Sequence, residues 1–274
     1  MTYAAPGTWR PPGKRADRIF LAGLAILLGT YTLLIVLMLA ADFAYVGGAG
    51  GGKSFLHSFV AAFRSPEIRS AMVLTMISCT MAAILSVFVA IPAGYLLSRF
   101  TFRGSRLIDA LLDIPIVLPP LVVGLSLLIL FQYLPRLVRE AVVYERPAVV
   151  LAQFAVACAF AVRIMRAEFD QIDERCALVA QTLGCSRQQA FFRIELPEAW
   201  PGVHTAATIA WARALGEFGP LLIFAGATRG KTEVLSTTVF LELSIGDLSA
   251  AVTVSLIMVA AAIAVVMTAR TWGS

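Results

Sequence analysis

Six long runs of apolar residues pass through this sequence, and each approaches or exceeds the length needed to cross a lipid bilayer. They cover positions 19–41, 69–98, 107–131, 147–165, 203–226 and 248–269. A spanning helix needs about 20 mostly apolar residues. Only 14% of the residues are charged, against roughly 25% in a soluble domain. The sequence therefore predicts an all-α, polytopic membrane protein with about six transmembrane helices.

Basic residues indicate how the chain is oriented. Four of them precede the first run, between positions 10 and 18, and three lie in the very short connection 99–106. Short loops rich in lysine and arginine stay in the cytoplasm, so we expect a multi-pass protein of the cytoplasmic membrane with both termini inside. The first run is longer than the about 7–15 apolar residues of a signal peptide, and we expect it to remain as a membrane helix.

This topology divides the chain into two parts. Residues 1–68 are expected to contain the cytoplasmic N-terminus, the first membrane helix and an external glycine-rich loop, and residues 69–270 to form a five-helix core. Within that core the polar stretch 166–202 is too charged to span the membrane, and it is expected to form a cytoplasmic loop. A loop of this size favours contact with a partner.

The loop has the pattern of a helical hairpin. Apolar residues at helical spacing lead up to Gly184, which is expected to end the first helix. Ser186 is a suitable N-cap for a second helix, and Pro197 and Pro201 are expected to stop that helix and return the chain to the membrane. The hairpin would present apolar side chains beside charges, which is typical of a surface that binds a partner. These side chains are Leu183, Phe191, Phe192 and Ile194.

The end of the loop resembles a family motif. Gly184, nine further residues and then Ile194-Glu195-Leu196-Pro197 are similar to the EAA loop of permease subunits of ABC importers, EAA-x3-G-x9-I-x-LP. At the front, Leu178-Val179-Ala180 replaces EAA, so only Ala180 agrees. The resemblance implies a cytoplasmic coupling helix that docks on a separate ATP-binding subunit. The docking residues that it implies are Ala180, Gly184, Ile194, Leu196 and Pro197.

Two further stretches resemble one branch of that family. The sequence ARALGEFG at 212–219, followed by FAG at 224–226, is similar to molybdate permeases, and sulfate permeases share much of the GEFG part. The sequence LPPLVVG at 118–124 is similar to the LPP-x3-G of the same group. The resemblance therefore identifies the chain as an oxyanion permease of the molybdate, tungstate and sulfate group, with the type I fold of ABC importer permeases.

The resemblance also implies a mechanism and a set of partners. The chain would be the membrane subunit of an ATP-driven importer that moves molybdate or tungstate, with sulfate next, by alternating access. An extracytoplasmic substrate-binding protein would deliver the ion, and two copies of the permease would form a homodimer. ATP and magnesium would bind to the partner subunit, so the chain itself is expected to be no enzyme and to bind no cofactor or metal.

Two charged residues fall inside the fifth apolar run. Arg213 and Glu217 are four residues apart and so share one face of a helix. Ionisable groups at membrane depth are costly and normally face the bundle interior or a wet cavity. The pair could line or gate the pathway, with Arg213 available to an anion, or it could be a mutually neutralised structural pair. The sequence leaves both interpretations open.

Prolines interrupt the third apolar run. Pro115, Pro119 and Pro120 lack a backbone donor and are expected to bend or break the helix. Together with Gly124 such a break could expose backbone groups to a passing ion, although a passive kink would have the same sequence. Asp109 and Asp113 lie in the same run, and we expect both acids to contact arginines of the cytoplasmic loops.

Other functions have weaker support. An ion-gradient-driven transporter of a small anion is the alternative, with Glu217 as its coupling carboxylate, but it predicts internal repeats, which the sequence lacks. Gly47–Ser54 matches the letters of a phosphate-binding loop, yet no strand precedes it as that motif requires, so we interpret it as an external loop. His57 and His204 have no partners at catalytic or metal-ligand spacing.

Overall fold

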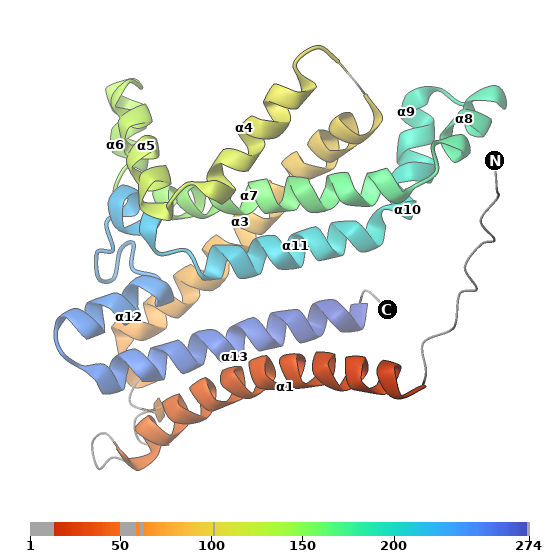
Figure 1. Ribbon diagram of the computed structural model, residues 1–274. Helices are drawn as coiled ribbons and strands as arrows, with labels where there is room; N and C mark the ends of the chain where they lie inside the picture. Colours follow the sequence, from red (N-terminus) through yellow and green to blue (C-terminus); the bar gives the residue numbers. More distant parts are fainter. Residues whose placement is uncertain (1–13, 50–58, 61–62, 101, 273–274) are drawn as a thin grey trace, which may run out of the picture. The chain divides into compact units, whose positions relative to one another are not determined.

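The computed structural model describes residues 14–49, 59–60, 63–100 and 102–272, and these ranges form helices and connections without a β-strand. The chain separates into two compact units, Met1–Phe55 and Leu56–Ser274. Figure 1 labels the helices of both. The predicted all-α class is confirmed.

The first unit is, in its described residues, one long helix. α1 runs from Lys14 to Ala44 and continues into the short segment η1, Tyr45–Ala49. The most apolar stretch of this helix buries none of its residues. A helix that is apolar all round and exposed is suited to a lipid environment.

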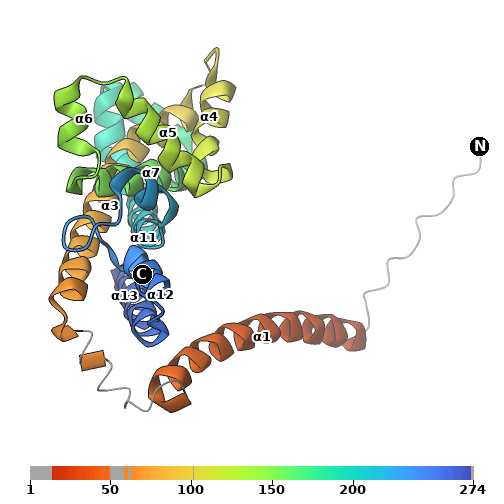
Figure 2. The same cartoon turned by 90° about the vertical axis from the view of Figure 1, so that its left-hand side faces the viewer.

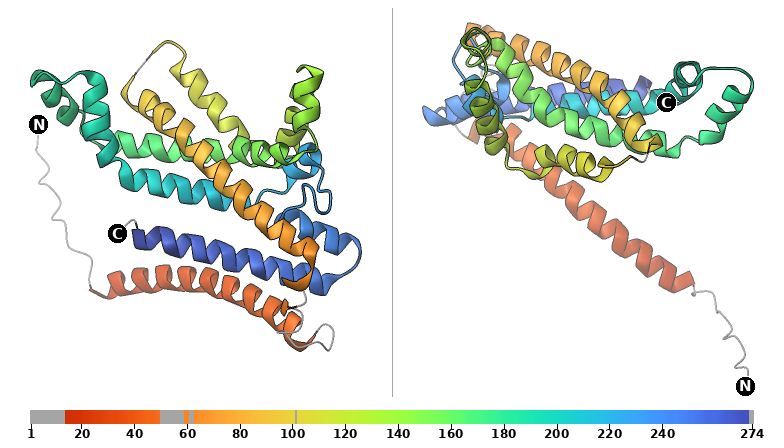
Figure 3. Two further views of the ribbon diagram at one scale, coloured as in Figure 1. Left: turned by 180° about the vertical axis from the view of Figure 1, so that it is seen from behind. Right: turned by 90° about the horizontal axis from the view of Figure 1, so that it is seen from above.

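Three helices form the centre of the second unit: α3 (Pro66–Arg99), α7 (Arg146–Gln171) and α11 (Trp200–Leu215). Figure 3 shows α3 crossing α7 and α11. Small side chains allow helix backbones to approach closely, which favours helix association within a membrane. The buried alanines of this core on the three helices include Ala82, Ala90, Ala157, Ala161, Ala206 and Ala210.

Shorter helices surround this centre. α4 (Ser105–Val117), α5 (Pro120–Gln132) and α6 (Arg136–Val142) lie against α7 (Figure 2). α12 (Leu235–Ser244) and α13 (Leu248–Trp272) pack on each other, and they also contact α3 and α11 respectively. The loop between α7 and α11 consists of α8, α9, the short π-helical segment η2 and α10.

Four of the described helices have the length and apolar composition to cross a membrane, and they correspond to the first, second, fourth and sixth apolar runs. The third run consists of α4 and α5, which are bent by 113° and count as a fifth span only if the pair is taken together. The fifth run also differs from the prediction. Its helix α11 has 16 residues, fewer than the about 20 that a span needs, and the segment η3 (Leu221–Ala225) follows after a break.

The break in the third run has a local cause. Pro119 and Pro120 cannot donate a backbone N–H, and a residue that precedes proline disfavours the helical conformation. Leu118 and Pro119 are accordingly extended, with ψ values of 142° and 133°. The break predicted at these prolines is confirmed. Pro115, in contrast, lies inside α4, which continues to Val117, so the helix does not break at that position.

Candidate functional site

The loop between α7 and α11 folds into the predicted hairpin. Its first arm, α8 (Glu174–Thr182), is capped by Asp173, whose side chain accepts a hydrogen bond from the Arg175 N–H at 3.0 Å. Gly184 then reverses the chain with φ of +95°, a conformation that costs a residue with a Cβ about 1–2 kcal/mol. Ser186 and Gln189 form a reciprocal capping box at the start of the second arm, α9 (Arg187–Ala190). The helix–glycine–helix prediction is confirmed.

The residues implied as docking residues divide between the inside and the outside of this hairpin. Ala180 is buried between the arms, and Ile194 packs against the same small cluster. Their placement makes them residues that hold the arms together. Gly184 and Pro197 are exposed. The large apolar side chains that face outward from the hairpin are Leu178, Val179, Leu183 and Phe192.

Pro197 and Pro201 do not end the second arm. The chain continues from α9 through η2 (Phe191–Glu195) into α10 (Leu196–Glu198) and α11, and the two prolines occupy the first turns of α10 and α11. A proline is tolerated there because its missing N–H would have no helical partner. The prediction that these prolines stop the helix is therefore wrong.

An ion pair that the sequence did not predict joins the hairpin to α3. Arg99, the last residue of α3, places Nε 3.0 Å from Oε1 of Glu195, and its Nη2 donates to the carbonyl of Ile172 at 2.9 Å. The side chains are only 7% and 2% exposed. Nη1 also lies 3.6 Å from Oε1 of the exposed Glu174. One guanidinium thus connects α3, the end of α7 and both arms of the hairpin.

Aromatic rings reinforce this connection. The rings of Tyr95 on α3 and Phe191 in η2 lie 4.5 Å apart between centroids, and Tyr95 also contacts Phe169 of α7 at 5.4 Å. Such ring contacts contribute about 0.5–1.5 kcal/mol beyond the burial of their area. Phe191, which the sequence placed in an exposed cluster, is therefore partly buried in the bundle, whereas its neighbour Phe192 remains exposed.

The two interrupted runs meet backbone to backbone. A Cβ on Gly124 of α5 would lie 2.7 Å from Cα of Pro220, and a Cβ on Gly219 would lie 2.8 Å from the backbone nitrogen of Leu121. Both distances are too short for any side chain, so glycine is required at the contact. The LPP stretch of the third run and the GEFG stretch of the fifth were predicted as separate features. In the structure their backbones are in direct contact.

Replacing Gly219 by alanine is expected to destabilise the protein by about 1–3 kcal/mol, because the added methyl group would push apart two backbones. Gly216→Ala is the matched control, since a Cβ at that position has its nearest neighbours 3.9 Å away. Thermal unfolding of the purified variants in detergent measures the difference. Equal stabilities for the two variants would contradict the close approach.

Arg213 and Glu217 form the expected pair. Nη2 of Arg213 lies 2.7 Å from Oε1 of Glu217, and the guanidinium sits over the ring of Phe160, 5.5 Å from its centroid. The two partners differ in access, because the side chain of Glu217 is 1% exposed and that of Arg213 is 31% exposed. Arg213 is thus the member that an ion could reach, and Glu217 is its buried counter-charge.

The variant Glu217→Gln removes the counter-charge while it keeps the shape of the side chain. We expect a loss of about 1–3 kcal/mol in stability, because a partly buried Arg213 is left without its partner. The double variant Arg213→Gln/Glu217→Gln should regain stability, since neither charge remains. Unfolding measurements on the three proteins test this expectation. A double variant less stable than Glu217→Gln would argue against mutual neutralisation.

Asp109 and Asp113 face α7. Arg163 pairs with both acids, with Nη1 3.4 Å from Oδ1 of Asp109, and Arg166 pairs with Asp109 as well. The expectation that these acids contact arginines is confirmed, although the partners belong to the α7 helix. Four charges are neutralised where α4 meets α7, which fixes α4 next to the hairpin end of the bundle.

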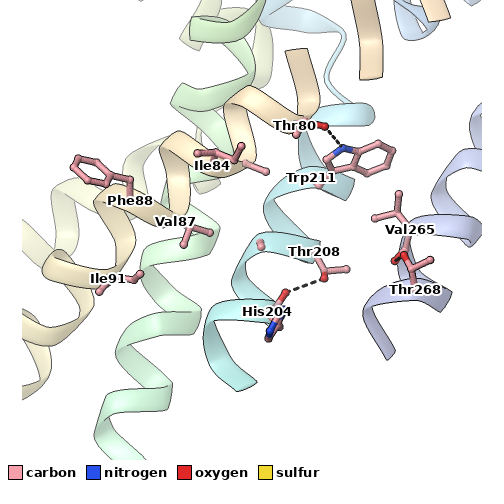
Figure 4. Close-up of a pocket in the computed structure, with 12 residues that line it drawn as sticks. Thr80, Ile84, Val87, Phe88, Ile91, His204, Thr208, Trp211, Val265 and Thr268 are labelled. Carbon is pink, nitrogen blue, oxygen red and sulfur yellow. Dashed lines mark hydrogen bonds between the residues drawn. The ribbon is translucent and has the colours of Figure 1, made fainter. Parts of the chain in front are cut away.

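A large groove of about 650 Å³ is lined by residues of α3, α11 and α13 (Figure 4). Its lining is mostly apolar, and none of the residues that line it is an aspartate, glutamate, lysine or arginine. Within it the indole N–H of Trp211 donates to Thr80 at 3.3 Å, and Thr208 donates to the carbonyl of His204 at 2.8 Å. The groove lacks the cations that would attract an oxyanion, and Arg213 and Glu217 do not line it.

The sequence raised two further kinds of site, a metal centre and a phosphate-binding loop. No group of three or more His, Cys, Asp and Glu side chains within the described ranges could hold a metal ion. Lys53 and Ser54 of the phosphate-loop pattern, and the histidine His57, lie outside the described residues. The four cysteines Cys79, Cys158, Cys176 and Cys185 are free.

Comparison with protein families identifies the chain. Residues 86–272 match the family described as "Binding-protein-dependent transport system inner membrane component". This chain therefore belongs to that family of importer permeases. The match begins within α3 and includes the hairpin, both interrupted runs and α13.

Curated relatives are oxyanion permeases. The molybdate/tungstate transport system permease protein WtpB of Pyrococcus abyssi is 36% identical over 166 residues, which are 61% of this chain and 64% of that protein. The molybdenum transport system permease protein ModB of Mycobacterium tuberculosis is 33% identical over 76% of this chain and 81% of its own length. The sulfate transport system permease protein CysT of Escherichia coli is 28% identical over 93% and 94%.

Solved structures share the fold. A bacterial ABC transporter involved in import of the acidic polysaccharide alginate superposes with a TM-score of 0.66 at 16% identity, covering 97% of this chain and 100% of that chain. A second structure, the alginate transporter in complex with alginate pentasaccharide-bound periplasmic protein, gives a TM-score of 0.70 at 19% identity, over 93% and 94%. The predicted fold of a type I ABC importer permease is confirmed.

Proposed function

We propose that this chain is the membrane subunit of an ATP-driven importer that carries an oxyanion, molybdate or tungstate first and sulfate next, across the cytoplasmic membrane. The family supports the importer class, and the named relatives support the oxyanion class. The structural observation that carries the proposal is the hairpin 174–198, which exposes apolar side chains yet is tied to α3 by a buried ion pair. An element that is exposed at its tip and fixed at its base can transmit force from a partner to the bundle.

The partners follow from this assignment. A separate ATP-binding subunit would dock on the exposed hairpin and bind ATP and magnesium, an extracytoplasmic binding protein would deliver the ion, and two copies of the permease would form the pathway. Both termini would lie in the cytoplasm. ATP binding would then favour one of two bundle conformations because the partner binds that conformation more tightly. Membership of the importer family favours this mechanism over transport driven by an ion gradient.

Uptake by a reconstituted system tests the proposal. The permease, its co-purified ATP-binding subunit and its binding protein are placed in liposomes, and uptake of molybdate, tungstate and sulfate is measured with ATP inside. We expect uptake that requires ATP and the binding protein and that survives ionophores. Uptake that follows an imposed ion gradient without ATP would contradict the proposal, and ATP-dependent uptake of none of the three ions would contradict the substrate class.

A further inference from the structure

A hollow of about 330 Å³ is lined by the first three turns of α3 and by the first residue of α7. These two helix ends are remote from the hairpin, which lies at the opposite end of the second unit (Figure 1). Two arginines, Arg69 and Arg146, line it together with Ser70. The remaining wall is apolar and includes Val73 and Ile77 of α3. No carboxylate is among the residues that line it.

The acids next to these arginines in the sequence are occupied elsewhere. Oε2 of Glu67 lies 2.8 Å from Nη1 of Arg229, and Glu145 pairs with Lys231, so the loop between η3 and α12 engages both carboxylates. Arg69 and Arg146 form no ion pair with any described residue. The hollow therefore holds two positive charges that the described part of the protein leaves uncompensated.

Pairs of arginines in two other polar hollows lie beside carboxylates. Beside the hairpin, the hollow that contains Arg99 and Arg175 also contains Asp170, Asp173 and Glu174. A smaller one with Arg99 and Arg187 contains Glu174 and Glu195. The arginines between α3 and α7 differ because the missing negative charge has to come from outside the described chain.

The depth of the hollow indicates what supplies that charge. α3 has 34 residues and so is roughly 50 Å long, whereas the hydrocarbon core is about 30 Å thick. Its first turn, with Arg69, therefore reaches the headgroup level, and Arg146 begins α7 in the same hollow. Val73 and Ile77 follow one and two turns deeper and are 55% and 53% exposed. Cations at headgroup depth above an apolar wall match the two ends of a phospholipid.

We propose that this hollow binds an anionic phospholipid. The phosphate accepts hydrogen bonds from Arg69 and Arg146, and an acyl chain lies along Val73 and Ile77. Arginine is suited to this role because its planar guanidinium can bind two phosphate oxygens at once. The proposal does not depend on which ion the protein transports.

Lipid titration of the full-length chain tests the site. The protein is purified in mild detergent, freed of lipid, and titrated with phosphatidylglycerol or phosphatidylcholine while bound lipid is counted by native mass spectrometry. We expect Arg69→Gln/Arg146→Gln to weaken phosphatidylglycerol binding at least about tenfold. The control Arg136→Gln/Arg139→Gln removes the same charge from α6, outside the hollow, and should bind like the native chain. Equal binding by both variants would overturn the proposal.

A second comparison separates a lipid phosphate from a free oxyanion. Val73→Asn changes only the apolar wall and should weaken phosphatidylglycerol binding several-fold, because the acyl chain loses part of its contact. Molybdate and inorganic phosphate are added at constant ionic strength as free competitors. If these anions displace the lipid from the native chain, or if Val73→Asn binds it unchanged, the lipid assignment is wrong. Gel filtration in detergent confirms that each variant is folded.

Discussion

Replacement of Arg99 by methionine is expected to destabilise the protein by about 3–5 kcal/mol. The variant leaves Glu195, which is 2% exposed, as an uncompensated charge in the bundle. It also removes the donor to the carbonyl of Ile172, so α3 loses its polar contacts with both Glu195 and the end of α7. Thermal or denaturant unfolding in mixed micelles measures the loss.

The double variant Arg99→Met/Glu195→Leu distinguishes burial of a lone charge from loss of a contact. Replacing both partners of a buried ion pair by apolar residues of similar size is often neutral or stabilising, so most of the stability should return. The exposed pair Arg136–Glu140, with side chains 81% and 58% exposed, supplies the control. Arg136→Met should cost no more than about 1 kcal/mol. A double variant as unstable as Arg99→Met would contradict the explanation.

The same double variant tests whether the ion pair transmits movement. In the native protein Glu195 lies in the hairpin and Arg99 at the end of α3, so a buried ion pair links the hairpin to the 34-residue helix α3. If the contact transmits force, the stable double variant should still bind the ATP-binding subunit but should transport less per ATP hydrolysed. Unchanged transport per ATP would reduce the pair to a structural role.

Leu183→Asp is expected to weaken binding of the ATP-binding subunit about 30-fold or more, which corresponds to about 2 kcal/mol at an interface hot spot. Leu183 is 81% exposed at the tip of the hairpin, so the substitution should not disturb folding. In a docked complex, however, it would bury a carboxylate against an apolar surface. Titration of the ATP-binding subunit onto the permease in nanodiscs gives the two dissociation constants.

Leu137→Asp is the matched control for this experiment. Leu137 in α6 is also 81% exposed, but it lies at the end of the bundle that is remote from the hairpin (Figure 1). The control should bind the ATP-binding subunit like the native chain. Native-like binding by Leu183→Asp would show that the docking surface lies elsewhere, and equal losses in both variants would indicate a general effect of the added charge.

Local signals in the sequence were sufficient for the helical class and for the hairpin. The turn at Gly184 and the cap at Ser186 depend on residues within a few positions of each other, and the motif ends in Ile194-Glu195-Leu196-Pro197. The break at Pro119 and Pro120 is local as well, because it follows from missing backbone donors. The prediction from sequence was wrong where a proline has two possible roles, since Pro197 lies in the first turn of a helix instead of ending one.

Tertiary structure alone decided which side chains act together. Arg99 and Glu195 are 96 positions apart, and the sequence showed the first only as a loop charge and the second only as a variable position of a motif. Gly124 and Gly219 likewise meet because two separate breaks pack on each other. The exposure of Leu183 and the burial of Ala180 depend on how the arms of the hairpin close. Periodicity and spacing describe one element at a time, whereas ion pairing, close approach and burial are set by the packing of elements far apart in the chain.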